Sequence, residues 1–251
     1  MPYTFLPDVA RPAVTVDMLV FTLREGALSL LLIERGLPPF RGRLALPGGF
    51  LHVGAGGAGG EALDDAAARE LREETGLGRE RVTLAQLGAF GRPGRDPRGR
   101  TITVAYFALV RPEAARGVRA GSDAAGARWL RVSDVDHDAL AFDHGRIVVE
   151  ALARLRHDVD RAGAALALVP ATFTARELRE VHETIHGRRL DAANFDRRLR
   201  RLIDDGLIEP VTERRPTGRR PARLFRAAST VSGEPARARS SARPGRSGRP
   251  A

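Results

Sequence analysis

Three glutamates near the middle of the chain have the type and spacing of metal ligands. Glu70, Glu73 and Glu74 are at positions i, i+3 and i+4 of residues 61–77, where apolar residues recur at helical spacing up to Gly76. On a helix the three carboxylates would share one face and repel one another. A divalent cation that prefers oxygen ligands would offset this repulsion, and a solvated acidic face is the alternative.

The order of residues around these glutamates resembles the Nudix box. Residues 69–77 read RELREETGL, Glu61 lies eight positions before Arg69, and residues 46–50 read LPGGF. Eleven residues separate Gly49 from Glu61 where the family has five, and removing residues 55–60, AGGAGG, restores the family spacing. The resemblance implies a Nudix hydrolase of nucleoside diphosphates linked to another group. It also implies a Mg²⁺ or Mn²⁺ site made by the Gly49 carbonyl with Glu70, Glu73 and Glu74, and a catalytic set of Glu73, Glu74 and Arg69, with Arg69 orienting a carboxylate.

Strands and helices that would position this site can be predicted along the first 160 residues. Apolar and β-branched runs predict strands at residues 14–23, 28–34, 44–46, 82–90, 101–110 and 127–130. Asp143 is a plausible N-cap of a helix whose apolar face is Ile147, Val148, Ala151, Leu152 and Leu155. This mixed order fits the α/β/α sandwich that the box implies for residues 1–160, and residues 162–171 are expected to be a connection.

Two arginine-rich loops could meet a phosphorylated ligand beside the acidic helix. Residues 35–43 read RGLPPFRGR and residues 91–100 read GRPGRDPRGR. The side chains expected to bind the ligand are Arg35, Phe40, Arg41 and Arg95, and the alternative is that these arginines are simply solvated. Two departures from the family pattern bear on turnover. The insertion could move the Gly49 carbonyl away from a metal, and Gly126 stands in the loop before Trp129 at the place of a further glutamate.

Composition limits the classes of protein to which the chain can belong. The chain has 251 residues, 43% of them hydrophobic, and no cysteine, which excludes disulfides and thiolate metal sites. No apolar stretch approaches the ~20 residues of a membrane span, and the first residues have no pattern of a secretory signal, so the cytoplasm is the expected location. The net charge of +10 lies entirely in residues 161–251, because residues 1–160 carry 21 arginines and 21 acids. Such asymmetry is typical of a chain with a polyanionic partner.

The last third of the chain predicts a second, winged helix-turn-helix domain at residues 161–227. Thr174 and Glu177 form a capping box before a helix that ends at Gly187. Asp191 caps a second helix, whose core is Phe195, Leu199, Leu202 and Ile203 and which stops at Gly206. Strands from residue 207 and at residues 223–225 would then flank a basic loop. Residues 228–251 are rich in Arg, Ser, Gly and Pro and predict a disordered tail.

The second helix of this domain has the side chains of a DNA recognition helix. Asn194, Arg197, Arg198 and Arg201 lie on one face, and arginine and asparagine can read guanine and adenine. Wing residues Arg214, Arg215, Arg219 and Arg220 would neutralise phosphates, and an exposed basic helix without a partner is the alternative. His182 and His186, at i and i+4, could suggest a metal pair. No third ligand is evident nearby in the sequence, so surface or capping roles are expected.

Together the two parts resemble the Nudix-related transcriptional regulators. The resemblance implies a homodimer that represses genes of NAD metabolism, binds a double-stranded DNA operator and senses ADP-ribose, with or without slow Mg²⁺-dependent hydrolysis. The alternative is a plain ADP-ribose pyrophosphatase whose basic C-terminal domain only mediates assembly. A third hypothesis is a hydrolase of sugar nucleotides or mutagenic nucleotides.

Overall fold

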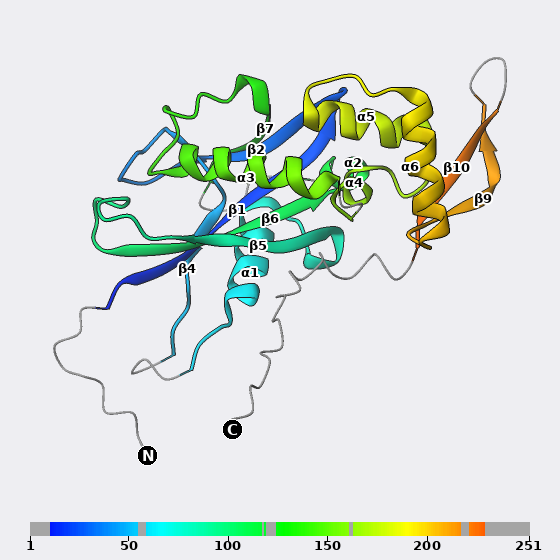
Figure 1. Ribbon diagram of the computed structural model, residues 1–251. Coiled ribbons are helices and arrows are strands. Elements are labelled where there is room, and N and C mark those ends of the chain that lie inside the picture. The colour runs from blue at the N-terminus through cyan, green and yellow to red at the C-terminus, as the bar shows by residue number, and fades with distance from the viewer. Residues whose placement is uncertain are drawn as a thin grey trace, which may run out of the picture.

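Seven strands form one mixed sheet in the N-terminal part of the chain (Figure 1). The computed structural model describes residues 11–54, 59–116, 118, 124–160, 163–216 and 221–228. The strands are β1 Ala13–Arg24, β2 Ala27–Arg35, β3 Leu44–Ala45, β4 Gly48–Phe50, β5 Val82–Phe90, β6 Thr101–Val110 and β7 Ala124–Arg131. Their order is β3-β2-β1-β6-β5, with β4 also paired to β1 and β7 to β2. β1 and β6 run parallel, and the other pairs are antiparallel.

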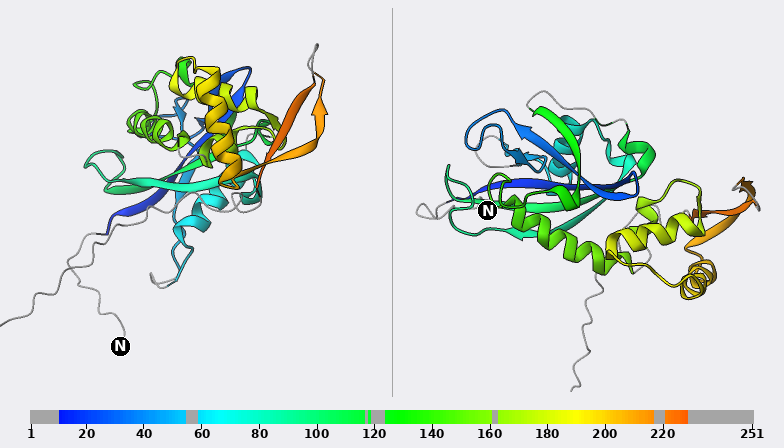
Figure 2. Two further views of the ribbon diagram at one scale, coloured as in Figure 1. Left: turned by 45° about the vertical axis from the view of Figure 1, so that its right-hand side comes forward. Right: turned by 90° about the horizontal axis from the view of Figure 1, so that it is seen from above.

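Strand β1 lies at the centre of the sheet and supplies side chains to both faces. Val16, Met18 and Val20 belong to the apolar cluster that includes the buried side of helix α1, Leu63–Thr75. Leu19 and Phe21 belong to the cluster that includes helix α3, His144–Val159. This follows from the alternation of side chains along a strand. The sheet therefore lies between α1 and α3 (Figure 2), and the predicted α/β/α sandwich is confirmed.

The ends of the two helices differ in how well the sequence predicted them. Helix α1 begins at Leu63, two residues after Glu61, and ends as expected at Gly76, whose φ of 71° is left-handed. Asp143 does occupy the position before α3, but its side chain makes no capping hydrogen bond. Its carboxylate instead accepts hydrogen bonds from Arg95, so the predicted capping role of Asp143 is wrong. Short helical segments complete this part: a 3₁₀ turn at Arg79–Arg81, α2 at Pro112–Ala115 and a second 3₁₀ turn at Val132–Asp134.

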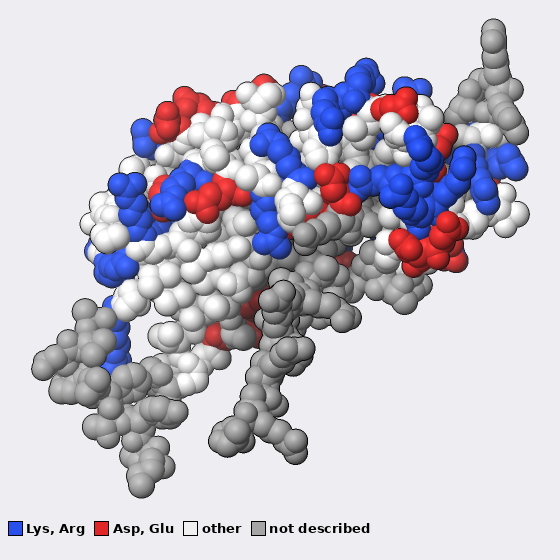
Figure 3. Space-filling view, viewed as in Figure 1, with Lys and Arg blue, Asp and Glu red and all other residues white. Residues whose placement is uncertain are grey.

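The C-terminal part is a winged helix, as predicted. It contains α4 Gly163–Leu168, β8 Phe173–Thr174, α5 Ala175–His186, α6 Ala192–Asp204, β9 Ile208–Arg215 and β10 Ala222–Ala227. The Thr174–Glu177 capping box is present, and the Asp191 side chain accepts a hydrogen bond from the Asn194 backbone. Basic side chains gather at this end of the molecule, over α6 and the β9–β10 hairpin (Figure 3). Residues 162–171, expected to be only a connection, include helix α4, which is buried because four of its six residues are Ala or Leu in the core.

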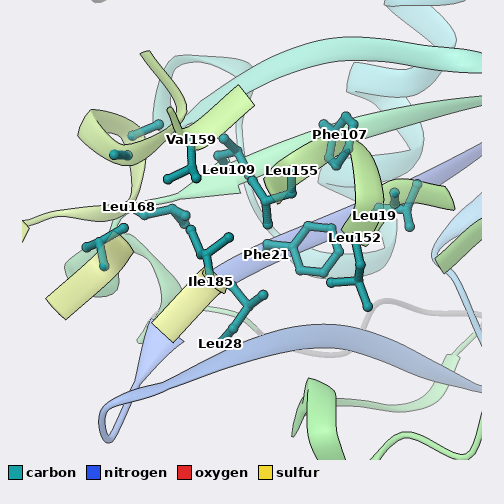
Figure 4. Packing of buried hydrophobic residues seen from close by; sticks show 14 of the residues in the cluster. Leu19, Phe21, Leu28, Phe107, Leu109, Leu152, Leu155, Val159, Leu168 and Ile185 are labelled. Atoms are coloured by element: carbon teal, nitrogen blue, oxygen red, sulfur yellow. The ribbon is translucent and has the colours of Figure 1, made fainter. Parts of the chain in front are cut away.

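One apolar core continues from the sandwich into the winged helix (Figure 4). It joins residues of β1, β2 and β6 to Leu152, Leu155 and Val159 of α3, then to Leu168 of α4 and Ile185 of α5. Helix α5 packs against α3, α4 and β2. The two parts of the chain are therefore separated by sequence pattern but not by a gap in the packing.

Some predictions concern residues outside the described part of the chain. These are Arg219 and Arg220 of the wing, most of the AGGAGG insertion, and residues 229–251 of the tail. Among the described residues, no helix is both long enough and apolar enough to cross a membrane.

Candidate functional site

Four glutamates lie on helix α1 and just before it, and three of them accept hydrogen bonds from Arg69. This acidic cluster comprises Glu61, Glu70, Glu73 and Glu74. The Arg69 guanidinium donates to both Glu61 oxygens at 2.6 and 2.9 Å, to Glu70 Oε1 at 2.7 Å and to Glu73 Oε2 at 3.2 Å. It also donates to the Phe50 carbonyl at 3.1 Å. Arg69 therefore orients carboxylates, which is the contact the resemblance implies, and its catalytic role stays a prediction.

Two glycines of β4 let the backbone approach the acidic cluster closely. The Gly48 amide donates to Glu74 Oε2 at 2.7 Å. A Cβ built on Gly49 would overlap the Glu70 carboxylate, so a larger residue at this position would displace that side chain. Strand β4 is held there by its pairing with β1, in which Gly49 faces Val16. The lack of a side chain at Gly49 thus brings the peptide backbone and a buried carboxylate together.

The residues on either side of the insertion before α1 are joined by hydrogen bonds. The His52 amide donates to Glu61 Oε1 at 2.8 Å, and the Glu61 amide donates to the His52 carbonyl at 3.1 Å. An isolated bridge joins Val53 to Gly60. The residues that flank the described ends of the insertion are therefore joined to each other, and the contact of Gly49 with Glu70 is kept.

The charge balance of the acidic cluster favours a cation. Burial raises the pKa of Glu70, which is 8% exposed, whereas hydrogen bonds from Arg69 lower the pKa of Glu61 to about 2. Three of the carboxylates, those of Glu61, Glu70 and Glu73, pair with the single guanidinium of Arg69, and every candidate ligand atom is an oxygen, which suits Mg²⁺ or Mn²⁺. Among the described residues no three of these carboxylates bring ligand atoms within 4.8 Å of one another, since Glu61, Glu70 and Glu73 are turned to Arg69 and Glu74 to the Gly48 amide. A bound cation would therefore need the half-exposed Glu73 side chain to turn.

Arginine side chains and aromatic rings lie next to the acidic cluster. The arginine–aromatic cluster comprises Arg35, Arg98, Phe40, Phe50 and Phe142. The Arg35 guanidinium lies 4.6 Å from the centre of the Phe142 ring, and Arg98 lies 5.1 Å from the Phe50 ring and 5.5 Å from the Phe142 ring. Phe40 and Phe142 meet edge to face at 4.9 Å. Burial and the nearby Arg98 both lower the pKa of Arg35.

The structure separates the four side chains that were predicted to bind a ligand. Arg35 and Phe40 belong to the arginine–aromatic cluster. Arg41 is exposed and donates to the Gly36 carbonyl. The Arg95 side chain is 3% exposed and donates to Asp143 at 2.8 Å and Asp17 at 3.2 Å, so its guanidinium is committed to a buried ion-pair network instead of a ligand.

Sequence reasoning missed Arg98, Phe50 and Phe142. The available signal was position: Phe50 follows Gly49 directly, and Phe142 directly precedes Asp143, the expected N-cap. Gly126, expected in a loop, lies in strand β7 instead.

The arginines predicted to contact DNA are not equivalent in the structure. On α6, Arg197 and Arg201 are exposed, and Arg197 donates to the Asn194 side chain. Arg198 turns toward the end of α3, where it donates to Asp160 Oδ1 at 3.0 Å and to the Val159 carbonyl at 3.2 Å. Arg200, which lies outside the helical face predicted to read DNA, is exposed on α6 as well.

The two described arginines predicted to act from the wing also differ in their contacts. Arg214 is exposed, whereas Arg215 donates to Glu177 Oε1 at 2.6 Å and to the Thr172 carbonyl at 3.1 Å. In this conformation Arg215 therefore holds β9 against the start of α5, and of the two described arginines predicted to act from the wing, Arg214 is the one that faces solvent.

The expectation that His182 and His186 have no third metal-ligating neighbour is wrong. Asp160, the residue after α3, brings a carboxylate oxygen to within 3.1 Å of His186 Nε2 and 3.9 Å of His182 Nδ1. It lies 22 positions before His182 in the sequence, so spacing within α5 could not reveal it.

Comparisons with known proteins agree with this two-part architecture. The NUDIX domain model matches residues 11–151, and the NrtR DNA-binding winged helix domain model matches residues 165–227. The ADPR responsive transcriptional repressor NtrR of Acinetobacter baylyi is 34% identical over 219 residues, which cover 87% of this chain and 83% of that protein.

Two further relatives match different lengths of the chain. An ADP-ribose pyrophosphatase of Methanocaldococcus jannaschii is 37% identical over 138 residues, 55% of this chain and 72% of that protein. The crystal structure of Shewanella oneidensis NrtR complexed with a 27mer DNA superposes with a TM-score of 0.71 at 30% identity, covering 87% of this chain and 95% of that one. The chain therefore belongs to the Nudix superfamily and, within it, to the Nudix-related transcriptional regulators that join a Nudix domain to an NrtR-type winged helix.

Proposed function

We propose that the chain is a transcriptional repressor that binds operator DNA through its winged helix and ADP-ribose through its Nudix domain. The observation that carries the proposal is that the likeness to an ADPR responsive repressor extends over both domains, and not over the Nudix domain alone. A function in nucleotide hydrolysis alone would account for the Nudix domain. It would not account for the basic second domain. We further propose that the protein acts as a homodimer at a palindromic site in genes of NAD metabolism.

Contact with DNA is assigned to the exposed arginines of α6 and β9. Arg197, Arg200 and Arg201 point away from the core and are placed to read guanine edges or to neutralise phosphates. Arg214 would contact the backbone from the wing. Arg198 and Arg215 would act indirectly, because they fix the orientation of α6 and β9 against the rest of the protein.

Binding of ADP-ribose is assigned to the corner between the acidic cluster and the arginine–aromatic cluster. The half-buried rings of Phe40 and Phe142 offer an apolar surface for an adenine, and the guanidiniums of Arg35 and Arg98, which now lie over the Phe142 ring, offer charge to a diphosphate. Glu74 is close enough to Arg35 to influence its pKa, which supports placing the two clusters at one ligand.

The shared apolar core supplies a route by which ADP-ribose could alter DNA binding. Helix α3 begins at the Arg95 ion-pair network, beside Phe142, and ends at Asp160, which holds Arg198 of α6. A shift of α3 on ligand binding would therefore move the recognition helix. Linkage requires that a ligand which weakens DNA binding is itself bound more weakly by the DNA complex, by the same factor.

The repressor proposal is tested by electrophoretic mobility shift with DNA from upstream of neighbouring genes, with and without ADP-ribose. Arg197→Ala with Arg201→Ala should weaken binding and lower the slope of log K against log salt by about 1 for each phosphate that is no longer neutralised. Arg146→Ala with Arg154→Ala is the matched control, because both are exposed arginines of α3 in the Nudix domain. No shift on any such fragment at low salt would refute the proposal and favour the plain pyrophosphatase.

Hydrolysis of ADP-ribose is the second part of the proposal, supported by the ADP-ribose pyrophosphatase relative and by the intact acidic cluster. Glu70, Glu73, Glu74 and the Gly49 carbonyl would hold Mg²⁺ or Mn²⁺. When bound, such a cation polarises a diphosphate and lowers the pKa of its bound water. Arg69 holds Glu61 and Glu70 in place, and the Gly48 amide orients Glu74.

Release of AMP from ADP-ribose in the presence of Mg²⁺ tests this part. Glu73→Gln and Glu74→Gln should each abolish the release, whereas Glu80→Gln, an exposed glutamate after α1, should leave it unchanged. Equal turnover in all three variants would place the metal elsewhere. An absence of turnover in the parent protein would limit the Nudix domain to sensing and leave the DNA result as the test of the repressor.

A further inference from the structure

A cluster of metal-ligating side chains lies where the Nudix domain meets the winged helix. Asp160 follows the last turn of α3, and His182 and His186 lie one turn apart on α5. His186 Nε2 is 3.1 Å and His182 Nδ1 is 3.9 Å from Asp160 Oδ1, and one ligand atom from each residue lies within 4.8 Å of those of the other two. This interdomain cluster is separate from the acidic cluster on α1.

One nitrogen of the interdomain cluster has no partner. His182 is 1% exposed, and its Nδ1 is buried without a hydrogen bond among the described residues. Buried polar atoms are nearly always paired, so an unpaired one calls for a missing ligand or a strained site. Burial and the nearby Arg198 lower the pKa of His182. The Phe195 ring packs against the imidazole at 5.5 Å and fixes its position.

We propose that Asp160, His182 and His186 form a site for a borderline divalent transition metal, with Zn²⁺ as the reference ion. Two imidazole nitrogens and one carboxylate are a common zinc donor set, with water as the fourth ligand. Mg²⁺ prefers oxygen ligands, so the two metal sites of this chain would differ in selectivity. The ligand atoms are farther apart than in a closed site. The Asp160 side chain is 53% exposed and can turn toward the histidines.

The Arg198 guanidinium already binds the Asp160 carboxylate, which a metal ion at this site would also bind. Its Nη1 donates to Asp160 Oδ1 at 3.0 Å, the same oxygen that lies nearest to both histidines. A metal bound to Asp160 would repel the guanidinium and compete for that oxygen. Asp160 also lines an open groove with Arg197, Arg198 and Arg201, so the carboxylate of the site is reached from solvent. Occupancy of the site would therefore break the ion pair of Arg198 with the Asp160 carboxylate, and the hydrogen bonds of Arg198 to the Val159 and Asp160 carbonyls would remain.

The test is titration of the full-length protein with ZnCl₂ against a chromophoric chelator, in excess Mg²⁺ so that the acidic cluster does not compete. We expect one Zn²⁺ per chain. Asp160→Asn and His186→Ala should each weaken binding by more than about tenfold, because loss of a direct ligand exceeds the usual effect of an outer partner. His157→Ala is the matched control, since this exposed histidine of α3 lies outside the cluster. Arg198→Ala should tighten binding by about two- to fivefold, the range for loss of a partly exposed ion pair.

Several outcomes would overturn the proposal. One is Zn²⁺ affinity that is the same in His186→Ala as in the parent, and another is affinity lost in Glu73→Gln but kept in Asp160→Asn. Asp160 lies at the surface, so its conservative substitution keeps the test informative if a histidine variant does not fold. Unchanged affinity in Arg198→Ala would refute the competition between the metal and the α6 arginine.

Discussion

Replacement of Ile185 by alanine should destabilise the whole described chain, not the winged helix alone. Ile185 is 4% exposed and lies in the apolar core that also contains residues of β1, β2 and α3. Truncation of a buried isoleucine to alanine costs about 2–5 kcal/mol, and we take about 3 kcal/mol because neighbours from two domains limit relaxation. For a folded unit of this size, about 2–4 °C of Tm is lost per kcal/mol, which gives a fall of about 6–12 °C.

Differential scanning calorimetry of the full-length protein measures this effect. A shared core predicts one unfolding transition for both domains, and Ile185→Ala should move that single transition to lower temperature. The matched control is Val149→Ala on α3, a β-branched residue of a helix whose side chain is 53% exposed. Its effect should stay within about 0.5 kcal/mol, or about 2 °C.

Two separate transitions, of which Ile185→Ala moves only one, would refute the reasoning. The domains would then unfold independently, and the core that joins them would contribute little to stability. The proposed transmission of an ADP-ribose signal through α3 would lose its physical basis as well, because it requires the winged helix to follow a shift of α3.

Three further substitutions test particular residues. Gly49→Ala should lower Mn²⁺ affinity at least about tenfold in an electron paramagnetic resonance titration, because the new Cβ overlaps the Glu70 carboxylate. Gly126→Ala is the control and should leave Mn²⁺ affinity unchanged, because a Cβ at Gly126 meets open space. Arg95→Met should lower the free energy of unfolding in urea by about 3–5 kcal/mol, because two aspartates lose a buried partner. Glu61 has a folded pKa of about 2 against an ordinary 4.5, so its ion pair adds stability above pH 4.5 that is lost as the pH falls toward 2. The Tm of Glu61→Gln should therefore vary less with pH in that window.

Each of these predictions has an outcome that contradicts it. Mn²⁺ affinity within about twofold of the parent in Gly49→Ala would show that this glycine does not shape the metal site. Unchanged stability of Arg95→Met together with lost ADP-ribose binding would return Arg95 to the ligand site. A Tm of Glu61→Gln that follows pH as the parent does would mean that the Glu61–Arg69 pair does not persist in solution.

The fold was largely predictable because its signals are local. The run of apolar and β-branched residues in β1, the capping box at Thr174 and the left-handed glycines that end α1 and α5 each act over a few residues. Helix α4 was missed for a physical reason. A short run of alanine and leucine after Gly163 has little to distinguish helix from connection until the core of the other domain packs on it.

The functional residues were less predictable, because their partners are distant in sequence. The box identified Arg69 and the glutamates it holds, since these residues lie close together along the chain. Arg95 looked like a ligand contact because its buried partners, Asp17 and Asp143, are 78 and 48 residues away. Arg198 was assigned to DNA on helical spacing alone, and only the packing of α3 beside α6 brings Asp160 to it.

The hydrogen-bonded residues on either side of the insertion mark a position where extra residues can be added to the chain. His52 and Glu61 are hydrogen-bonded to each other, and Val53 is bridged to Gly60, so the metal corner and α1 are positioned by residues outside the segment between them. Lengthening a loop whose ends are fixed costs only about 0.6 kcal/mol for each doubling. A fluorescent protein or an affinity tag inserted between Gly54 and Gly59 would therefore sit next to the proposed ADP-ribose site without breaking its framework, which makes this segment a suitable place to build a reporter of ligand binding.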